Sequence, residues 1–275
     1  MEGLTKSISW IIGIALIAIL FYILGDIILV SVKNFSLSFL LDSPFSGGRK
    51  GGIYPIIIST LLILAVSLLV VIPVGLTSAL FLAEFAENNS KSIAIIRKSI
   101  EILSAVPSIV FGLFGNAIFS VYFGMGFSIL SGGLTLAIMA LPLFITTVEK
   151  GIRSVPNNYR FVAFSLGMSQ FTMIKSIIIP YALPAIFVGI VLSVGRALAE
   201  TAALIFTSGY VDRIPESLFD SGRTLSVHIY DLTMNVPGGD INAYKTSLVL
   251  IVLILATNTL INILLKSWYK KRIAL

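Results

Sequence analysis

The side chains best suited to chemistry in this sequence are two charged residues inside one apolar stretch. Arg196 and Glu200 stand four positions apart in the run 181–208, so a continuous helix would place both on one face. Charge at bilayer depth costs about 3 kcal/mol or more unless it is paired or hydrated. The pattern therefore predicts either an ion pair inside a bundle or a cation that meets an anion, since the guanidinium fork matches a tetrahedral oxyanion. Thr201 adds a hydroxyl donor beside them.

Groups for enzyme chemistry are few. The sequence has no cysteine and one histidine, His228, which lies near Asp231 in a polar segment and is interpreted as a loop residue rather than a metal ligand. Ser108 and Glu200 are the candidate nucleophile and base at depth, and no spacing pairs them. No Gly-x-x-x-x-Gly-Lys-Ser/Thr loop occurs, so no nucleotide site is predicted. We expect a protein that is not an enzyme, with no catalytic residue and no metal site.

Composition describes the surroundings of these residues. Of the 275 residues, 57% are hydrophobic and 12% charged, against about 25% charged in an average soluble domain. This balance predicts an all-α polytopic membrane protein, a single transmembrane domain over residues 1–275. The net charge of +6 does not indicate nucleic-acid binding, because no basic helix or RNA-binding signature accompanies it. Apolar runs predict six spans, at about 8–32, 53–85, 100–123, 128–148, 181–208 and 247–265.

Prolines interrupt two of these spans. Pro73 predicts a bend in the long second span. Pro107 and Ser108, followed by Gly112 and Gly115, allow a broken helix whose freed amides face an anion in a cavity. The alternative is a kinked helix whose two glycines let neighbouring helices approach.

Charged residues gather where the second span ends. Glu84, Glu87 and residues 88–91 predict a polar hairpin. In the next element Arg97 stands four positions before Glu101, a spacing that predicts an ion pair within one helix, worth a few tenths of a kcal/mol.

The segment 156–184, here called the knob, is the least membrane-like long stretch with helical spacing. Asn157 and Asn158 are expected to cap a short helix. Gly167 suits the left-handed residue beyond its end, and Ser169 can cap a second helix through Phe171. A helix–turn–helix of this kind either rests on the lipid surface or fills the groove of a cytoplasmic partner.

Lys and Arg predict the orientation. Six spans put both termini on one side, and twelve of the nineteen Lys and Arg residues fall on that side, against five on the other. Because basic residues favour the cytoplasmic side, we expect both termini and the loop 149–180 in the cytoplasm. The 36 residues of segment 209–244 then form an outer loop, long enough to be a cap or a partner surface.

Several motifs resemble those of type I ABC-importer permeases. That family has a Glu-Ala-Ala triplet, a glycine four residues later and an Ile-x-x-Pro, and this sequence has Ala163, Gly167 and Ile177-x-x-Pro180. Phe161 and Val162 occupy the first two triplet positions, so the contact expected there is one of shape rather than charge. The stretches GGIYP, VPSIVFGLFG, SGGLTLAIMALP and GRALAETAAL, in this order along the chain, are similar to the PstA permeases of phosphate importers.

This resemblance implies a transport subunit of the cytoplasmic (inner) membrane that imports inorganic phosphate by alternating access. It implies a second, PstC-like permease, a PstB-like ATPase dimer, an external PstS-like phosphate-binding protein and a PhoU-like regulator. ATP and Mg²⁺ would be bound by the ATPase, and no cofactor is expected in this chain. The expected substrate-pathway residues are Arg196, Glu200, Ser108 and Thr201. The residues expected to contact the ATPase are Phe161, Val162, Ala163, Gly167, Met168, Ser169 and Phe171.

Two alternatives stay open from the residues themselves. An arginine does not choose among tetrahedral anions, so a permease for sulfate or molybdate fits the same pattern. A membrane signalling or scaffold subunit without transport also fits, because the knob and the outer loop can each bind partners.

Overall fold

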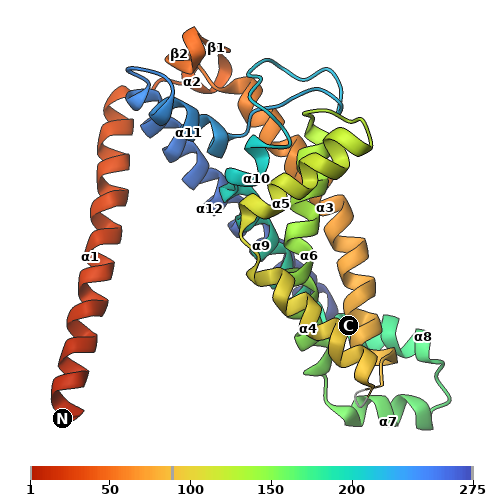
Figure 1. Ribbon diagram of the computed structural model, residues 1–275. Helices are drawn as coiled ribbons and strands as arrows, with labels where there is room; N and C mark the ends of the chain where they lie inside the picture. Colours follow the sequence, from red (N-terminus) through yellow and green to blue (C-terminus); the bar gives the residue numbers. More distant parts are fainter. Residues whose placement is uncertain (1, 88–89, 274–275) are drawn as a thin grey trace.

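The structure is a computed structural model that describes residues 2–87 and 90–273. Helices run between the two ends of an elongated bundle (Figure 1). Within the described residues, five helices are long and apolar enough to cross a membrane, and the bent pair α4 and α5 makes a sixth span if it crosses as one unit. The expected all-α polytopic fold is confirmed. The long helices and the bent pair are α1 Glu2–Asn34, α3 Tyr54–Leu80, α4 Lys91–Ala105, α5 Ser108–Gly115, α6 Ile129–Arg153, α9 Ile179–Ala199 and α12 Asp240–Ile273.

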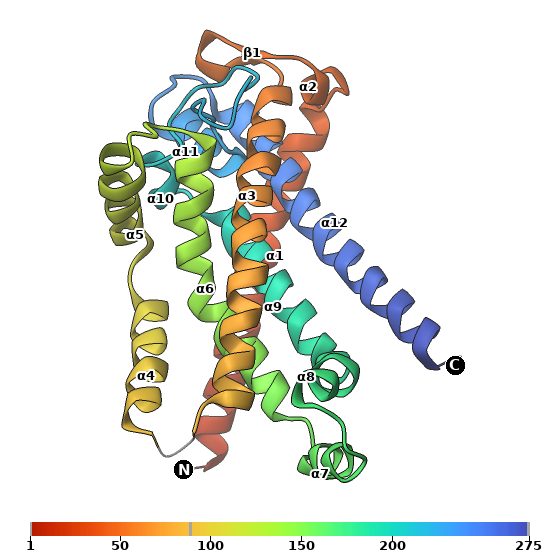
Figure 2. The ribbon, with the colours of Figure 1, turned by 90° about the vertical axis from the view of Figure 1, so that its right-hand side faces the viewer.

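Short elements close the two ends of the bundle. One end carries the knob helices α7 and α8, and the other carries a β-hairpin and α11 (Figures 1 and 2). The hairpin pairs Pro44 with Gly51 and Phe45 with Lys50 in antiparallel register. These elements are α2 Ser38–Leu41, β1 Pro44–Phe45, β2 Lys50–Gly51, α7 Asn157–Ser165, α8 Gln170–Met173, α10 Ala202–Ile205 and α11 Leu225–Met234, with a 3₁₀ turn at Ser46–Gly48 and π-helical turns at Phe81–Phe85, Asn116–Tyr122 and Ile174–Ile178.

The helix α6 forms the centre of the bundle, between α3 and α9. Phe144 of α6 is fully buried, and Gly75 of α3 and Gly189 of α9 make room for its ring. A Cβ at Gly75 would lie 2.4 Å from Phe144 Cδ1, so a side chain there would displace the ring. The most apolar 18-residue stretch of α1, in contrast, has no buried residue. That helix packs against α12, where the Tyr244 hydroxyl donates to Asp26 over 2.9 Å.

The third predicted span, 100–123, is broken. The axes of α4 and α5 differ by 100°. Val106 is extended, with ψ of 133°, because the ring of Pro107 disfavours a helical residue before it and proline has no N–H for the helical ladder. The two glycines also allow neighbouring helices to pack closely, as the alternative interpretation predicted. Gly112 approaches the backbone of α10, and Gly115 approaches α6. The segment is a broken helix whose second half is closely packed.

The fifth span and the outer segment also differ from expectation. The helix α9 ends at Ala199 instead of continuing to residue 208, and α10 follows after a break at Glu200. The segment 209–244 is not one loop, because it contains α11 and the start of α12. The predicted polar hairpin includes Asn88 and Asn89, which lie outside the described residues.

Candidate functional site

Glu200 lies beyond the helix that carries Arg196. Its backbone is extended, with ψ of 128°, and its carboxylate Oε1 accepts a hydrogen bond of 3.0 Å from the Ala203 N–H at the start of α10. Its carbonyl oxygen accepts the Ser226 hydroxyl proton over 2.5 Å, which ties the break to α11. The prediction that Arg196 and Glu200 share one helical face is therefore wrong. The helix α9 ends at Ala199, so Glu200 is no longer part of the helix that carries Arg196.

Arg196 occupies the last turn of α9 and is half-buried. Across residues 2–87 and 90–273, no hydrogen bond or ion pair engages its guanidinium group. The C-terminal end of a helix carries partial negative charge, which favours a cation at this position. Since no acidic side chain of the described chain neutralises it, the guanidinium keeps its five N–H donors for another partner.

The break before α5 and the break after α9 face one another. Val106 packs against an apolar cluster that contains Val194 of α9 and Leu204 of α10. Gly112 brings α5 directly onto α10, because a Cβ at this position would lie 2.7 Å from the Cα of Ala203. Two interrupted helices therefore meet in the same part of the bundle, where backbone groups are released from helical hydrogen bonds.

Ser108 and Thr201 lie on these neighbouring elements. Ser108 is the first residue of α5, and Thr201 directly precedes α10. Both are half-buried, and in the part of the chain that the structure describes no hydrogen bond joins either hydroxyl to Arg196 or to the other. The structure therefore places a guanidinium group and two hydroxyl groups close to the two helix breaks.

The knob folds as a helix–turn–helix. Gly167 adopts φ of +70° beyond the end of α7, and the Ser169 hydroxyl accepts the Thr172 N–H at the start of α8. The expected caps at Asn157 and Asn158 are wrong, because Pro156 occupies the N-cap and both asparagines lie inside α7. The helix α8 continues through a π-helical turn into α9, so the knob leads directly into the fifth span.

The seven residues expected to contact an ATPase divide into three groups. Phe161, Val162 and Phe171 point outward, with exposed fractions of 68%, 57% and 75%. Ala163 is fully buried and Met168 is half-buried, and both pack in the core cluster of the bundle. Gly167 and Ser169 form the turn between α7 and α8. The knob thus presents an apolar exposed surface, and Ala163 and Met168 anchor its other side to the core of the bundle.

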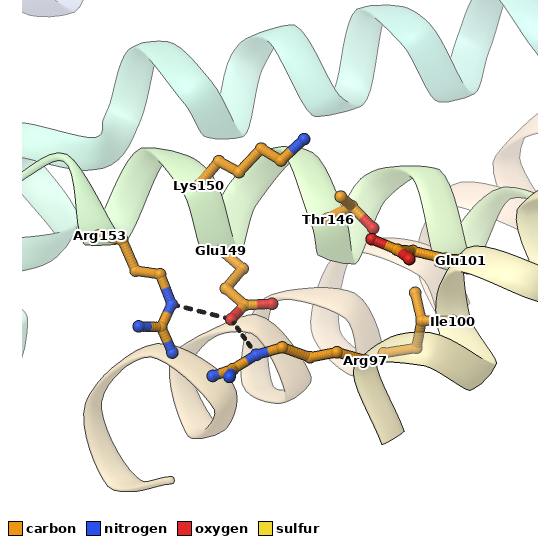
Figure 3. A pocket seen from close by; sticks show the side chains of 7 residues that line it. All are labelled: Arg97, Ile100, Glu101, Thr146, Glu149, Lys150 and Arg153. Carbon is orange, nitrogen blue, oxygen red and sulfur yellow. Dashed lines mark hydrogen bonds and ion pairs between the residues drawn. The ribbon is translucent and has the colours of Figure 1, made fainter. Parts of the chain in front are cut away.

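A buried acid missed by the sequence interpretation organises the charges beside the knob. Glu149 Oε1 accepts hydrogen bonds of 2.9 Å from both Arg97 Nε and Arg153 Nε (Figure 3). The Leu82 carbonyl oxygen accepts from the same two guanidinium groups, over 3.0 and 2.7 Å. The predicted ion pair between Arg97 and Glu101 is wrong. The i,i+4 spacing of Glu149 and Arg153 was the one signal in the sequence for this site.

Next to these arginines lies a pocket of about 310 Å³. Figure 3 shows Glu101 and Thr146 on one side of it and the two arginines on the other. Because Glu149 already accepts from both arginines, the pocket contains a structural charge cluster rather than an open acidic site.

His228 is part of a buried charge cluster at the opposite end of the bundle, and its interpretation as a loop residue is wrong. It lies on α11 with no exposed surface, and Arg223 Nη1 approaches its Nδ1 at 3.2 Å. The same guanidinium nitrogen pairs with Asp231 over 3.0 Å. Burial, and then the charge of Arg223, lower the pKa of His228 to about 3. Among the described residues, no group of three His, Cys, Asp or Glu side chains is arranged to hold a metal ion.

The fold, with its broken span and exposed knob, is shared with membrane proteins of known structure. Among solved structures, the chain is similar to a bacterial ABC transporter involved in the import of the acidic polysaccharide alginate, with a TM-score of 0.66 and 16% identity. The match covers 93% of this chain and 94% of the other. At this identity the likeness establishes the fold.

The chain belongs to the family described as binding-protein-dependent transport system inner membrane component, which it matches over residues 72–273. It is 34% identical over 269 residues to the probable ABC transporter permease protein YqgI of Bacillus subtilis, covering 92% of this chain and 91% of that protein. It is also 34% identical over 170 residues to the phosphate transport system permease protein PstA 2 of Mycobacterium bovis. That second match covers 62% of this chain and 56% of the relative.

Proposed function

We propose that this chain is the permease subunit of an ATP-driven importer of inorganic phosphate. The observation that carries the proposal is the half-buried Arg196, which has no partner among the described residues and stands at the end of a broken span. The PstA-like relative supports phosphate as the substrate. A membrane protein does not hold an unneutralised guanidinium in a bundle without a large cost, so an anion that visits the site gives the residue its purpose.

In this proposal Arg196 is a transient stop for the anion. Its fork donates to two phosphate oxygens, and the hydroxyls of Ser108 and Thr201 add donors from the facing breaks. The site must also release its cargo, so a few donors are better suited than a deep cage. Glu200 has a different role from the one expected, since its carboxylate is already engaged in capping α10. It holds the break in shape.

Energy comes from a separate PstB-like ATPase dimer that binds ATP and Mg²⁺. The apolar outer face of the knob, with Phe161 and Phe171 at its surface, fits a groove on that partner. A PstC-like second permease completes the passage. A PstS-like phosphate-binding protein docks at the opposite end, over segment 209–244. The excess of Lys and Arg supports a cytoplasmic position for the knob and both termini. A PhoU-like regulator would act from that side.

Uptake of labelled phosphate by cells that express the complete transporter tests this function. We expect sulfate and molybdate to inhibit phosphate uptake only weakly. We expect phosphate uptake to fall when Arg196 is replaced by alanine. Sulfate or molybdate uptake as the sole activity would overturn phosphate as the substrate. Unchanged phosphate uptake in both the Arg196→Ala and Phe171→Ser variants would overturn the roles proposed for these two residues. Unchanged uptake in cells that lack this chain would overturn the transport role and favour a signalling or scaffold subunit.

A further inference from the structure

The inner end of α3 gathers side chains from four other elements. Its last turn, Phe81–Phe85, is π-helical, and the Leu82 carbonyl accepts from arginines of α4 and α6. Arg160 of α7 donates to the carboxylate of Glu84 through both Nε and Nη2, over 3.2 and 2.5 Å. Gln170 of α8 donates to the Glu84 carbonyl oxygen over 3.4 Å.

The two acids in these contacts are largely shielded from water, while Arg97 and Arg153 stay 29% and 33% exposed. The Glu84 side chain is 4% exposed and its partner Arg160 is 18% exposed. The Glu149 side chain, which accepts from arginines of α4 and α6, is 11% exposed. A paired charge that is buried to this degree holds its geometry strongly, because losing one partner leaves the other uncompensated. The two acids therefore join α3, α4, the end of α6 and the knob into one unit.

The apolar packing also separates α4 from α5. Ile93 of α4 shares a core cluster with Leu82 and with Ala163 and Met173 of the knob. Phe111 of α5 belongs instead to a second cluster, together with residues of α9, α10 and the first halves of α3 and α6. The two halves of the broken third span are thus packed into different parts of the core.

The second half of that span is fixed to its own neighbours. Asn116 Nδ2 donates to the Phe206 carbonyl oxygen over 2.6 Å. A Cβ at Gly115 would lie 2.1 Å from the Thr135 hydroxyl oxygen, which measures how closely α5 and α6 approach. The helix α5 is therefore held against α6 and against the segment after α10.

No helical hydrogen bond crosses the junction between the two halves. The Val106 N–H donates back to Leu103, the Val110 N–H donates to the Pro107 carbonyl, and Pro107 has no N–H. The junction has the backbone of a hinge, since the residues on either side belong to separate ladders and separate clusters.

We propose that Glu84 and Glu149 fasten α4 to the knob, so that displacement of the knob by its partner moves α4 as one body and bends the third span at Val106–Pro107. This inference rests on the proposed function, because it assigns a path for the motion that an ATPase would impose. The bend lies directly before Ser108, so the motion shifts the start of α5 relative to α4. Glu84 and Glu149 are positioning residues that act through the three arginines.

Spin-label distances in the complete transporter, reconstituted with its ATPase, test the proposal. The natural sequence has no cysteine, so single cysteines can be introduced at exposed positions: Lys98 on α4, Asn158 on α7 and Val110 on α5. On addition of ATP we expect the distance from position 98 to position 158 to stay constant and the distance from 98 to 110 to change. A change in the first distance with a constant second distance would overturn the proposal.

Variants of the two acids provide a second readout. In Glu149→Gln and Glu84→Gln we expect phosphate uptake to fall about 5- to 150-fold, the range of ordinary coupling free energies, while ATP hydrolysis continues. The distance from 98 to 158 should then change with ATP. Glu101→Gln is the matched control, because Glu101 is exposed and has no ion pair in the described chain.

A charge exchange separates positioning from simple stability. The double variant Glu84→Arg with Arg160→Glu should regain part of the uptake lost in Glu84→Gln, and no recovery at matched thermal stability would count against the proposed link. Import of sulfate instead of phosphate would overturn the proposed cargo but not the hinge, since the label distances do not depend on the cargo. Constant distances for both label pairs during ATP-driven uptake would overturn the hinge but not the transport function.

Discussion

Replacing Arg196 by alanine should weaken transport while leaving the fold intact. The side chain makes no hydrogen bond or ion pair within residues 2–87 and 90–273, so its removal leaves no buried acid unpaired there. We expect the free energy of unfolding not to fall, because the substitution breaks no specific interaction and removes a charge that is costly inside a membrane bundle.

The effect on phosphate is expected to be much larger. Hydrogen bonds to charged groups contribute about 1.5–3 kcal/mol, and every 1.4 kcal/mol corresponds to about a tenfold change in affinity. Arg196→Ala should therefore raise the phosphate concentration for half-maximal uptake about 10- to 150-fold. Arg196→Lys keeps the charge but loses the planar fork, so its effect should lie between those of arginine and alanine.

The assay combines initial rates of labelled phosphate uptake into proteoliposomes with thermal unfolding of the same preparations. Arg223→Ala is the matched control, because Arg223 is 7% exposed and pairs with Asp231 and His228 at the end of the bundle opposite the knob. Breaking that buried cluster should cost about 3–5 kcal/mol of stability. The reasoning is refuted if Arg196→Ala destabilises the protein as much as Arg223→Ala does and leaves the half-saturating phosphate concentration unchanged.

Three further predictions concern packing, pH and the knob. Gly112→Ala should cost about 1–3 kcal/mol in thermal unfolding because its Cβ would meet the Ala203 backbone, whereas Gly195→Ala, with nothing within 4 Å, should not destabilise. His228 has a pKa of about 3 when folded and 6.5 as a free side chain, so the unfolded chain binds the proton more tightly. Stability is then full above pH 6.5 and falls toward pH 3 by up to about 1.4 kcal/mol per unit, a slope that His228→Gln should reduce in unfolding curves. Phe171→Ser, at a residue 75% exposed, should preserve stability but weaken ATPase binding on the order of tenfold in a pull-down titration, and equal binding would contradict a role of that ring in docking.

The sequence by itself determined the features that depend on local chemistry. Apolar runs predicted membrane spans because lipid requires a continuous hydrophobic surface. Pro107 indicated a broken or kinked helix because its ring and missing N–H act on adjacent residues. The turn of the knob followed from Gly167 and Ser169 for the same reason, since a left-handed residue and a hydroxyl cap are requirements of a few neighbouring positions.

The tertiary structure alone decided which charges meet. Sequence spacing paired Arg97 with Glu101, and Arg196 with Glu200, on the assumption of uninterrupted helices and local partners. In the folded chain Arg97 reaches Glu149 on another helix, and Glu200 turns away because α9 has already ended. A long arginine side chain can pair with an acid that is close in space, whatever its distance in the sequence. Burial strengthens the attraction, because the effective dielectric constant is lower away from water. Distance in three dimensions is not encoded in helical periodicity, so the arginine links to the knob and the buried position of His228 became visible only once the helices had packed.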